Sequence, residues 1–157
     1  MKRILLLTIV ICSLTTCQKT NDKLETESPI DPLLNNFISS WNNNDSITAK
    51  NMFASDAIVF DDNIIAKNHE ELMSNWIRPL ITTITNVQME KTQEWVTEDL
   101  AGCSGFWSID ILHNDSVAAS YKGVMTFIWI LSEKGEWKIS HAHLHSFYED
   151  EDMNEDI

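Results

Sequence analysis

The stretch Trp137-Lys-Ile-Ser-His-Ala-His-Leu-His-Ser146 alternates large or imidazole side chains with others and predicts a β-strand. In a regular strand, successive side chains point to opposite sides of the sheet. One face would then carry Trp137, Ile139, His141, His143 and His145. Because the first two need a hydrophobic core to cover them, we expect the three imidazoles to line the mouth of an internal cavity. Such an arrangement is typical of a binding site.

The N-terminus has the pattern of an export signal. Lys2 and Arg3 precede an apolar stretch, residues 4–12, that is too short to span a bilayer. The next residues, Leu14-Thr-Thr-Cys17, resemble the lipobox of bacterial lipoproteins, in which the cysteine becomes the acylated first residue of the mature chain. We therefore expect an exported protein that a lipid on Cys17 attaches to a membrane of the cell envelope, in the periplasm or at the cell surface. A soluble exported protein is the alternative.

The composition limits the partners of this chain. Its formal net charge of −13 at pH 7 argues against nucleic acid and anionic membrane surfaces as partners. Cys12 leaves with the signal, and Cys103 then has no cysteine within the folded body to pair with. No intramolecular disulfide is expected, so stability must come from packing.

The mature chain divides into three segments after the signal peptide, residues 1–16. Residues 17–30 are polar and show no regular spacing of apolar residues, so they predict a flexible tether. Residues 31–148 have the usual size of one domain. Residues 149–157 contain an acidic run and predict a disordered tail.

The regular spacing of apolar residues changes once along the domain. Helical spacing dominates its first half, with two brief strands between the second and third predicted helices, and a period of two dominates from residue 86 onward. This order predicts an α+β fold in which helices pack on an antiparallel meander. The four long strands are expected at residues 86–96, 102–113, 116–131 and 136–147.

The two faces of this sheet differ in bulk. The bulkier face, which we expect to be the inner one, carries Met89, Trp95, Trp107, Ile109, Ile111, Tyr121, Met125, Phe127 and Trp129. The other face is not wholly polar, because it carries Phe106, Leu112, Val124, Ile128 and Ile130. An exposed apolar patch of that kind usually marks an interface, so we expect a homodimer formed through the sheet.

Three motifs carry a resemblance to a known family. They are the segment Phe53-Ala-Ser-Asp-Ala-Ile-Val-Phe-Asp61, the helix start at Asn68 and the final Trp-x-Ile-x-His-x-His-x-x-Ser strand. Together with three helices before a curved sheet, they resemble the SnoaL-like group of the nuclear transport factor 2-like superfamily. The resemblance implies a cone-shaped domain with three N-terminal helices packed on a strongly curved antiparallel sheet. Relatives include ketosteroid isomerases, polyketide cyclases, kinase association domains and proteins with no known reaction.

A binding function is the first hypothesis. We expect a pocket between the first and third helices and the inner face of the sheet, with a small, largely apolar molecule as ligand and no cofactor. An accessory module of the envelope without a reaction belongs to the same hypothesis. The residues expected to line the pocket are Asp61, Trp107, Tyr121, His141 and His143.

An enzyme of isomerase, cyclase or dehydratase type is the alternative. In the ketosteroid isomerases an apolar-x-Asp strand carries the proton-transferring aspartate, and the resemblance places Asp61 at that position. His141 or His143 would then polarise a carbonyl group. The resemblance also argues against this chemistry, because the isomerase's tyrosine falls at about Phe37 and no acidic residue lies between Ser116 and Ser132.

Structural roles explain the same residues without chemistry. Asp61 could be a turn residue that caps backbone amides, and the histidines could be neutral groups hydrogen-bonded inside the cone. Four tryptophans have core-facing positions, where such residues more often fill volume than bind a ligand: Trp41, Trp76, Trp107 and Trp129. A metal would need a His-x-His pair and a third ligand from Asp61, Asp62 or His113, which the sequence does not fix, so we predict no metal site.

Overall fold

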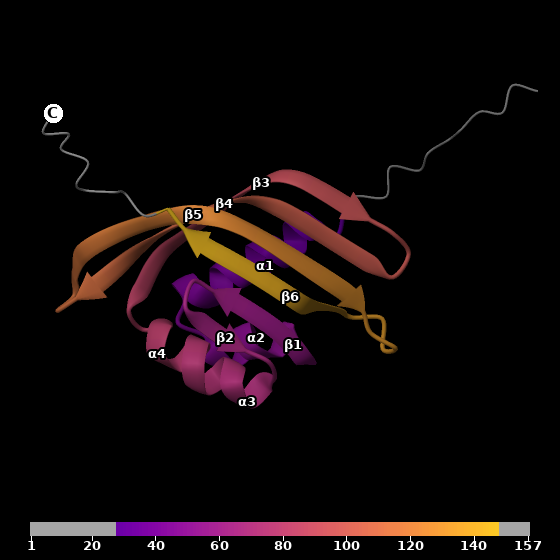
Figure 1. Cartoon of the computed structure of the whole chain (residues 1–157), viewed down its shortest axis with the longest axis horizontal. Coiled ribbons are helices and arrows are strands. Elements are labelled where there is room, and N and C mark those ends of the chain that lie inside the picture. The colour runs from indigo at the N-terminus through magenta and orange to yellow at the C-terminus, as the bar shows by residue number, and fades with distance from the viewer. Residues whose placement is uncertain (1–27, 148–157) are drawn as a thin grey trace, which may run out of the picture.

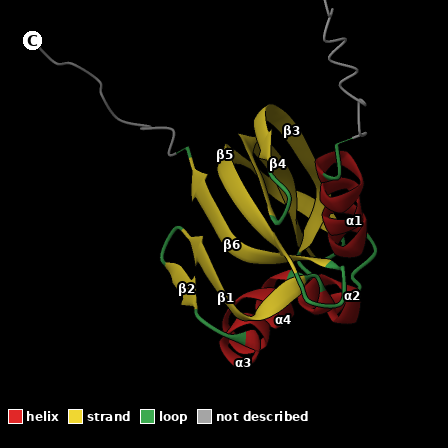
Figure 2. Cartoon of the chain, turned by 90° about the vertical axis from the view of Figure 1, so that its right-hand side faces the viewer, coloured by secondary structure: helices red, strands yellow, loops and turns green. Residues whose placement is uncertain are grey.

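The computed structural model describes residues 28–147 as a strongly curved sheet with its helices on one side (Figure 1, Figure 2). The predictions for the signal peptide, Cys17, the tether before residue 28 and the acidic tail lie outside these residues. The helices are α1 (Ile30–Asn42), α2 (Ser46–Asn51), α3 (His69–Glu71), the π-helical η1 (Leu72–Ile77) and α4 (Arg78–Leu80). The strands are β1 (Phe53–Asp61), β2 (Ile64–Ala66), β3 (Ile84–Val96), β4 (Leu100–His113), β5 (Ser116–Leu131) and β6 (Trp137–Ser146).

The sheet contains the predicted meander and one pairing that the sequence did not indicate. Its strand order is β2-β1-β6-β5-β4-β3, and β3 to β6 pair antiparallel in sequence order. Strand β1 adds to the free edge of β6 in parallel and forms a hairpin with β2. The predicted α+β cone is therefore the observed fold, with a mixed sheet. No helix within residues 28–147 is long and apolar enough to cross a membrane.

The predicted third helix begins where its capping residue indicates. The side chain of Asn68 accepts hydrogen bonds from the backbone amides of Glu70 and Glu71, at 3.0 and 2.9 Å. The carboxylate of Glu71 in turn accepts from the amide of Lys67 at 2.9 Å. These bonds satisfy amides that have no partner within the helix. From there, α3, η1 and α4 follow one another without a break and place Trp76 against the core.

Aromatic side chains fill the inside of the cone. Phe37 and Trp41 of α1, Phe53 of β1 and Trp76 of η1 pack on one another, with ring centroids 4.9 to 6.4 Å apart. Phe127 of β5 lies edge-on against Phe37 at 5.0 Å. Each large aromatic side chain removes 150–250 Å² from water, so this cluster supplies much of the hydrophobic stabilisation. The prediction that Trp41, Trp76, Trp107 and Trp129 occupy core positions is confirmed, since all four are buried.

The prediction that the histidines face the core is wrong, and a β-bulge is the reason. Trp129 of β5 pairs with Ile139, whereas Ile128 pairs with His141, so β6 has one extra residue, Ser140, at this point. An extra residue exchanges the two faces for the rest of the strand. Ile139 and Ala142 are therefore fully buried, and Leu144 is buried as well. His141, His143 and His145 are exposed on the opposite face of the sheet.

A second bulge corrects the assignment of Trp95 to the inner face. Lys91 pairs with Gly105 and Gln93 pairs with Ser104, which leaves Thr92 as the extra residue of β3. Beyond the bulge, Trp95 lies over Gly102, where a Cβ atom would approach its ring to 2.2 Å. The indole is more than a third exposed and covers the outside of the sheet rather than its core.

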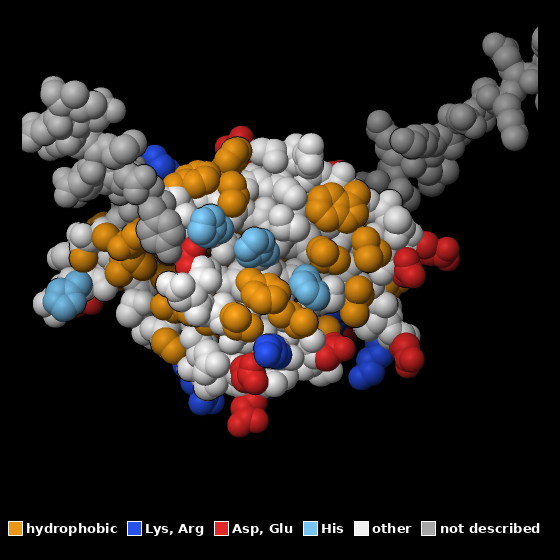
Figure 3. All heavy atoms as spheres, in the orientation of Figure 1, with side chains coloured by type: hydrophobic (Ala, Val, Ile, Leu, Met, Phe, Trp, Pro, Cys, Tyr) orange, Lys and Arg blue, Asp and Glu red, His pale blue; other side chains and the backbone are white. Residues whose placement is uncertain are grey.

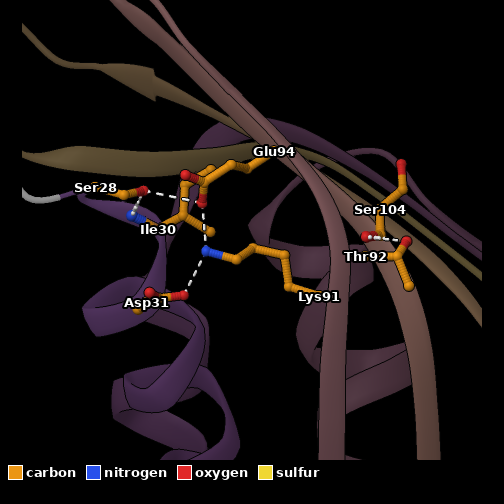
Figure 4. A network of polar contacts seen from close by, with 7 residues as sticks. All are labelled: Ser28, Ile30, Asp31, Lys91, Thr92, Glu94 and Ser104. Carbon is orange, nitrogen blue, oxygen red and sulfur yellow. Dashed lines mark hydrogen bonds and ion pairs between the residues drawn. The ribbon is translucent and has the colours of Figure 1, made fainter.

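A polar network joins the start of α1 to β3 just before this bulge (Figure 4). The ammonium group of Lys91 contacts the carboxylates of Asp31, at 2.5 Å, and Glu94. Ser28 donates a hydrogen bond to the same Glu94 carboxylate at 3.1 Å. Exposed ion pairs contribute at most about 1 kcal/mol, so the network sets the direction of α1 more than it stabilises the fold.

The bulge at Ser140 predicts effects of very different size for two nearby substitutions. Ala142→Gln puts a larger polar side chain into the core and should lower the free energy of unfolding by about 2–4 kcal/mol. His143→Gln changes an exposed residue and should alter it by less than about 0.5 kcal/mol. Urea denaturation of both variants at low protein concentration measures the difference. Without the bulge the order would be reversed, and that result would contradict the observed register.

Candidate functional site

Asp61 lies where β1 ends, and its carboxylate is held by a tryptophan. The Nε1 atom of Trp76 donates a hydrogen bond to Asp61 Oδ2 at 2.6 Å. Strand β1 brings the carboxylate to the rim of the cone, and the turn into β2 begins at Asp62, which has a φ of 48°. The contact differs from the structural role considered for Asp61, because the partner is an indole N–H from the helical layer rather than a turn amide. It connects that layer to the end of the strand.

The hollow inside the cone is small. A cavity of about 40 Å³ lies between α1, η1 and the inner face of the sheet, where the pocket was predicted. Phe37, Trp41 and Trp76 form its helical side, and Asp61 lies on its wall. Since drug-sized ligands occupy pockets of about 300–1,000 Å³, this space holds little more than a water molecule. The interior as it stands cannot enclose a steroid-sized molecule.

A larger hollow opens outward from the same residues. It has a volume of about 320 Å³ and lies at the mouth of the cone, between the β1–β2 turn, α4 and the strands β3 to β5. Asp61 lines both the mouth and the inner cavity, and so do Ile84, Trp107 and Ile109, which means that the two spaces adjoin each other at these residues. The mouth is mainly apolar and aromatic, with its carboxylates on one side. Its further lining residues include Ile64, Leu80, Ile111 and Tyr121.

The charge of Asp61 is poorly compensated. Partial burial raises the pKa of its carboxyl group above the usual range, the hydrogen bond from Trp76 opposes this, and the nearby charge of Asp62 adds to the rise. Among the described residues that line the inner cavity and the mouth there is no lysine, arginine or histidine. The site therefore presents a desolvated carboxylate without a cationic partner on its walls.

The neighbouring carboxylate, Asp62, has partners of its own. Its Oδ1 atom accepts from the backbone amide of Ser146 at 2.9 Å and lies 3.0 Å from His145 Nδ1. Its Oδ2 atom accepts from the Ser146 hydroxyl at 2.5 Å. Burial alone would raise the pKa of Asp62, but the Ser146 bonds and His145 together lower it below the usual range. Asp62 thus ties the β1–β2 turn to the end of β6.

The structure brings together only part of the predicted binding set. Asp61 and Trp107 line both hollows, and Tyr121 lines the mouth and is 48% exposed. His141 and His143 do not belong to this site, because the Ser140 bulge turns them to the other side of the sheet. Neither imidazole can therefore polarise a group bound next to Asp61, which removes the electrophile of the enzyme hypothesis.

Two tryptophans of the site were interpreted from the sequence only as core residues. Trp76 is the hydrogen-bond partner of Asp61, and Trp41 lines the inner cavity with an Nε1 atom that has no partner in the structure. A buried indole N–H usually finds an acceptor, and this requirement is the only sequence signal that could have drawn attention to them. No group of three or more histidine, cysteine or acidic side chains within residues 28–147 could hold a metal ion.

Comparison with known proteins identifies the fold. No protein family matches the sequence by its family model, and no curated protein matches it. Among solved structures, a nuclear transport factor 2-like superfamily protein from Salmonella enterica serovar Typhimurium superposes with a TM-score of 0.64 and 14% identity, covering 80% of this chain and 93% of that one. A putative ketosteroid isomerase from Shewanella frigidimarina gives a TM-score of 0.62 and 14% identity, covering 75% and 95%.

A third similar structure is a putative calcium/calmodulin dependent protein kinase II association domain from Xanthomonas campestris. Its TM-score is 0.65 with 13% identity, over 76% of this chain and 86% of that one. At such identities the likeness concerns the fold and not the chemistry. The protein has the nuclear transport factor 2-like fold.

The raised pKa of Asp61 predicts a pH-dependent effect of Asp61→Asn. The native state holds this proton more tightly than the unfolded chain, whose aspartates titrate near pH 4. The free energy of unfolding therefore falls as the pH rises through the folded-state pKa, and the cost is fully present at pH 7. Asp61→Asn should have a higher unfolding midpoint than the wild type at pH 7.

The difference in midpoint should shrink as the pH is lowered through the folded-state pKa of Asp61, because the wild-type carboxyl group becomes neutral as well. Thermal unfolding of both proteins across this range measures it. Asp56→Asn on the same strand is the matched control, because Asp56 is exposed and its substitution should change little at any pH. A variant Asp61→Asn that is less stable than the wild type at pH 7 would contradict the interpretation.

Proposed function

We propose that this protein binds a small ligand with an apolar body and a positively charged amine, seated in the mouth of the cone with the amine at Asp61. The observation that carries the proposal is the half-buried Asp61 carboxylate at the junction of the mouth and the inner cavity. A ligand of this kind would supply the cation that the walls lack. This class of ligand, an amine with an apolar body, is more specific than the small, largely apolar molecule expected from the sequence.

Three features of the mouth support an amine rather than an acid or a neutral lipid. Asp61 and Asp62 both lie on its lining and no basic side chain does, so an anionic ligand would meet like charge. Trp107 and Tyr121 offer aromatic surfaces to a cation, which such rings attract. The volume of about 320 Å³ suits a ligand with one or two rings.

A second candidate function rests on the same carboxylate. The raised pKa of Asp61 makes it a better general base, as the isomerase, cyclase or dehydratase hypothesis requires. Such chemistry also needs a donor for the developing negative charge. Trp76 already donates to Asp61, and the unpaired N–H group of Trp41 lies on the wall of a cavity of about 40 Å³ that is too small to hold a substrate. Binding is therefore the function that the geometry supports better.

We further propose that the protein acts in the cell envelope, with Cys17 as its lipidated residue. The support for this lies in the sequence alone, in the basic start, the short apolar stretch and Leu14-Thr-Thr-Cys17. The twelve residues between Cys17 and α1, residues 18–29, would allow the domain to stand clear of the membrane while it binds its ligand.

A series of indole compounds tests the proposed ligand class. Tryptamine, tryptophol and indolepropionic acid share one aromatic body and differ in carrying an ammonium, a hydroxyl or a carboxylate group. We expect tryptamine to bind at least about tenfold more tightly than the acid, because charge-assisted hydrogen bonds contribute about 1.5–3 kcal/mol. Calorimetry at pH 7 measures the three affinities.

Asp61→Asn should abolish the preference for tryptamine, while Asp56→Asn should keep it, since Asp56 is an exposed residue of the same strand. Equal affinities for the three compounds, or a preference that survives Asp61→Asn, would refute the proposal.

The proposed lipid anchor is tested by Cys17→Ser. This substitution removes the sulfur atom that would carry the lipid, so the protein should move from the membrane fraction to the soluble fraction of the cell envelope. Immunoblotting of fractionated cells measures the distribution. Unchanged membrane association of the variant would exclude Cys17 as the anchor, and Cys103→Ser serves as the control for loss of a cysteine elsewhere.

A further inference from the structure

Apolar side chains gather at one end of the sheet, where the turn between β3 and β4 lies beside the end of β5. Figure 3 shows apolar side chains at this end, on the right of the molecule. Backbone contacts hold the end together, because Leu100 pairs with Ile130 and the Leu131 amide donates to the carbonyl group of Asp99 at 2.9 Å. Five large apolar side chains here are 36–45% exposed, and we call them the apolar tip: Trp95, Val96, Leu100, Ile130 and Leu131.

The apolar tip surrounds the end of the sheet instead of lying flat on one face. Trp95 covers the outside of the sheet over Gly102, and Ile130 belongs to the same outer side. Val96 and Leu131 each follow one of these residues along a strand, so they point to the other side. Such a group does not offer the flat area of about 800 Å² that each partner of a standard protein interface buries. Contact with a membrane is the other common role of an exposed apolar patch.

The chain enters the domain beside the apolar tip. Helix α1 begins next to the end of β3, and Ser28, just before this helix, donates to the Glu94 carboxylate at 3.1 Å (Figure 1, Figure 4). Glu94 directly precedes Trp95 in the sequence. As the flexible tether predicted from the sequence, the ten residues 18–27 would span about 16–19 Å. A lipid on Cys17 would therefore keep this end of the domain nearest to the bilayer.

We propose that the apolar tip lies in the interfacial layer of the bilayer to which Cys17 is anchored, and that the mouth of the cone thereby opens away from the membrane. The proposal rests on the lipid anchor proposed at Cys17 and is independent of the ligand at Asp61. The mouth includes Ile84, the first residue of β3, whereas the tip includes Val96, the last. The 13 residues of β3 rise about 3.3 Å each, so mouth and tip lie about 40 Å apart along the strand. A ligand would then reach Asp61 from the aqueous phase.

The residue types of the apolar tip suit the border between lipid headgroups and acyl chains. Tryptophan is enriched at this depth because its ring is apolar and its N–H group can bind a polar partner. Trp95 is 37% exposed and is accompanied by four aliphatic side chains. A short tether raises the local concentration of the tip at the bilayer to about the millimolar range. A few partly exposed side chains are therefore enough to orient a domain that the lipid already attaches.

Charge beside the apolar tip determines the kind of headgroup that it contacts. The turn between β3 and β4 carries Glu98 and Asp99, which are both exposed. Anionic lipids give a membrane surface a negative potential, which repels carboxylates that lie close to it. We therefore expect the tip to enter a layer of zwitterionic headgroups, such as phosphatidylcholine, more readily than an anionic one.

Fluorescence quenching on vesicles tests the contact. The chain from Cys17 onward is coupled through this thiol to a maleimide lipid in phosphatidylcholine vesicles whose acyl chains are brominated close to the headgroup. Cys103 does not compete for the reagent, because it is buried and burial raises the pKa of its thiol to about 11. The chemical link replaces the native lipid, so the result does not depend on whether cells acylate Cys17.

Bromine quenches an indole only when the ring lies within the bilayer. Relative to vesicles without bromine, we expect a loss of about one sixth of the emission, because Trp95 is one of six tryptophans. Trp95→Phe should show no loss. An equal mixture of phosphatidylcholine and phosphatidylglycerol should reduce the quenching of the wild type, because of the carboxylates beside the tip.

Matched substitutions separate the apolar tip from the rest of the surface. Val96→Asp should abolish the quenching, because it places a carboxylate where the tip enters the bilayer. Leu100→Asp should do the same and replaces the first variant if that one folds poorly by circular dichroism. Val117→Asp is the control at the other end of the sheet, where Val117 is 58% exposed, and it should leave the quenching unchanged.

Three outcomes would overturn the proposal. Unquenched emission from the coupled wild type would show that the tip does not reach the bilayer, as would be the case if a second copy covered it. A loss that persists in Trp95→Phe would place a different tryptophan at the membrane. A loss that withstands both Val96→Asp and Leu100→Asp would mean that the tip does not make the contact. Failure of the lipid anchor itself is recognised separately, by unchanged fractionation of Cys17→Ser in cells.

Discussion

Strand β6 has one residue more than the segment of β5 with which it pairs, and this extra residue at Ser140 determines which side of the sheet each following side chain occupies. The Ser140 hydroxyl donates to the carbonyl group of Ile128 at 3.2 Å, which ties the bulge to the neighbouring strand. Because β5 and β6 are the middle strands, the change of face affects both the inside of the cone and its outer surface. Small and aliphatic side chains close the core, and the imidazoles face outward.

The inside of the cone is consequently filled. With Leu144 and the aromatic side chains of α1 and η1 lining it, the enclosed space measures about 40 Å³. The larger hollow lies at the rim of the cone, and Asp61 lines both this mouth and the inner cavity. Two effects on the charge of Asp61 oppose each other: burial disfavours the charged carboxylate, and the Trp76 hydrogen bond offsets part of that cost. A carboxylate that remains destabilised in the free protein has free energy to gain from a cationic ligand.

Two successive carboxylates at the end of β1 have different environments. Asp61 binds an indole of the helical layer, while Asp62, in a left-handed conformation, binds Ser146 and His145 of the final strand. Asp62 is therefore satisfied within the protein and Asp61 is not. This difference is the physical reason for assigning a ligand to Asp61 alone, and it depends on the sharp turn that follows β1.

The sequence by itself determined the elements and the class of fold. Apolar periods, the Asn68 cap and the resemblance of Phe53-Ala-Ser-Asp-Ala-Ile-Val-Phe-Asp61 predicted helices on a curved sheet, and Asp61 and Trp107 as lining residues. These features depend on local patterns that a single segment carries. The tertiary structure alone decided the face of His141 and His143, the position of Trp95 and the pairing of Trp76 with Asp61. A bulge arises from the register between two strands, and a hydrogen bond between a helix and a strand arises from packing, so neither leaves a signal within one segment.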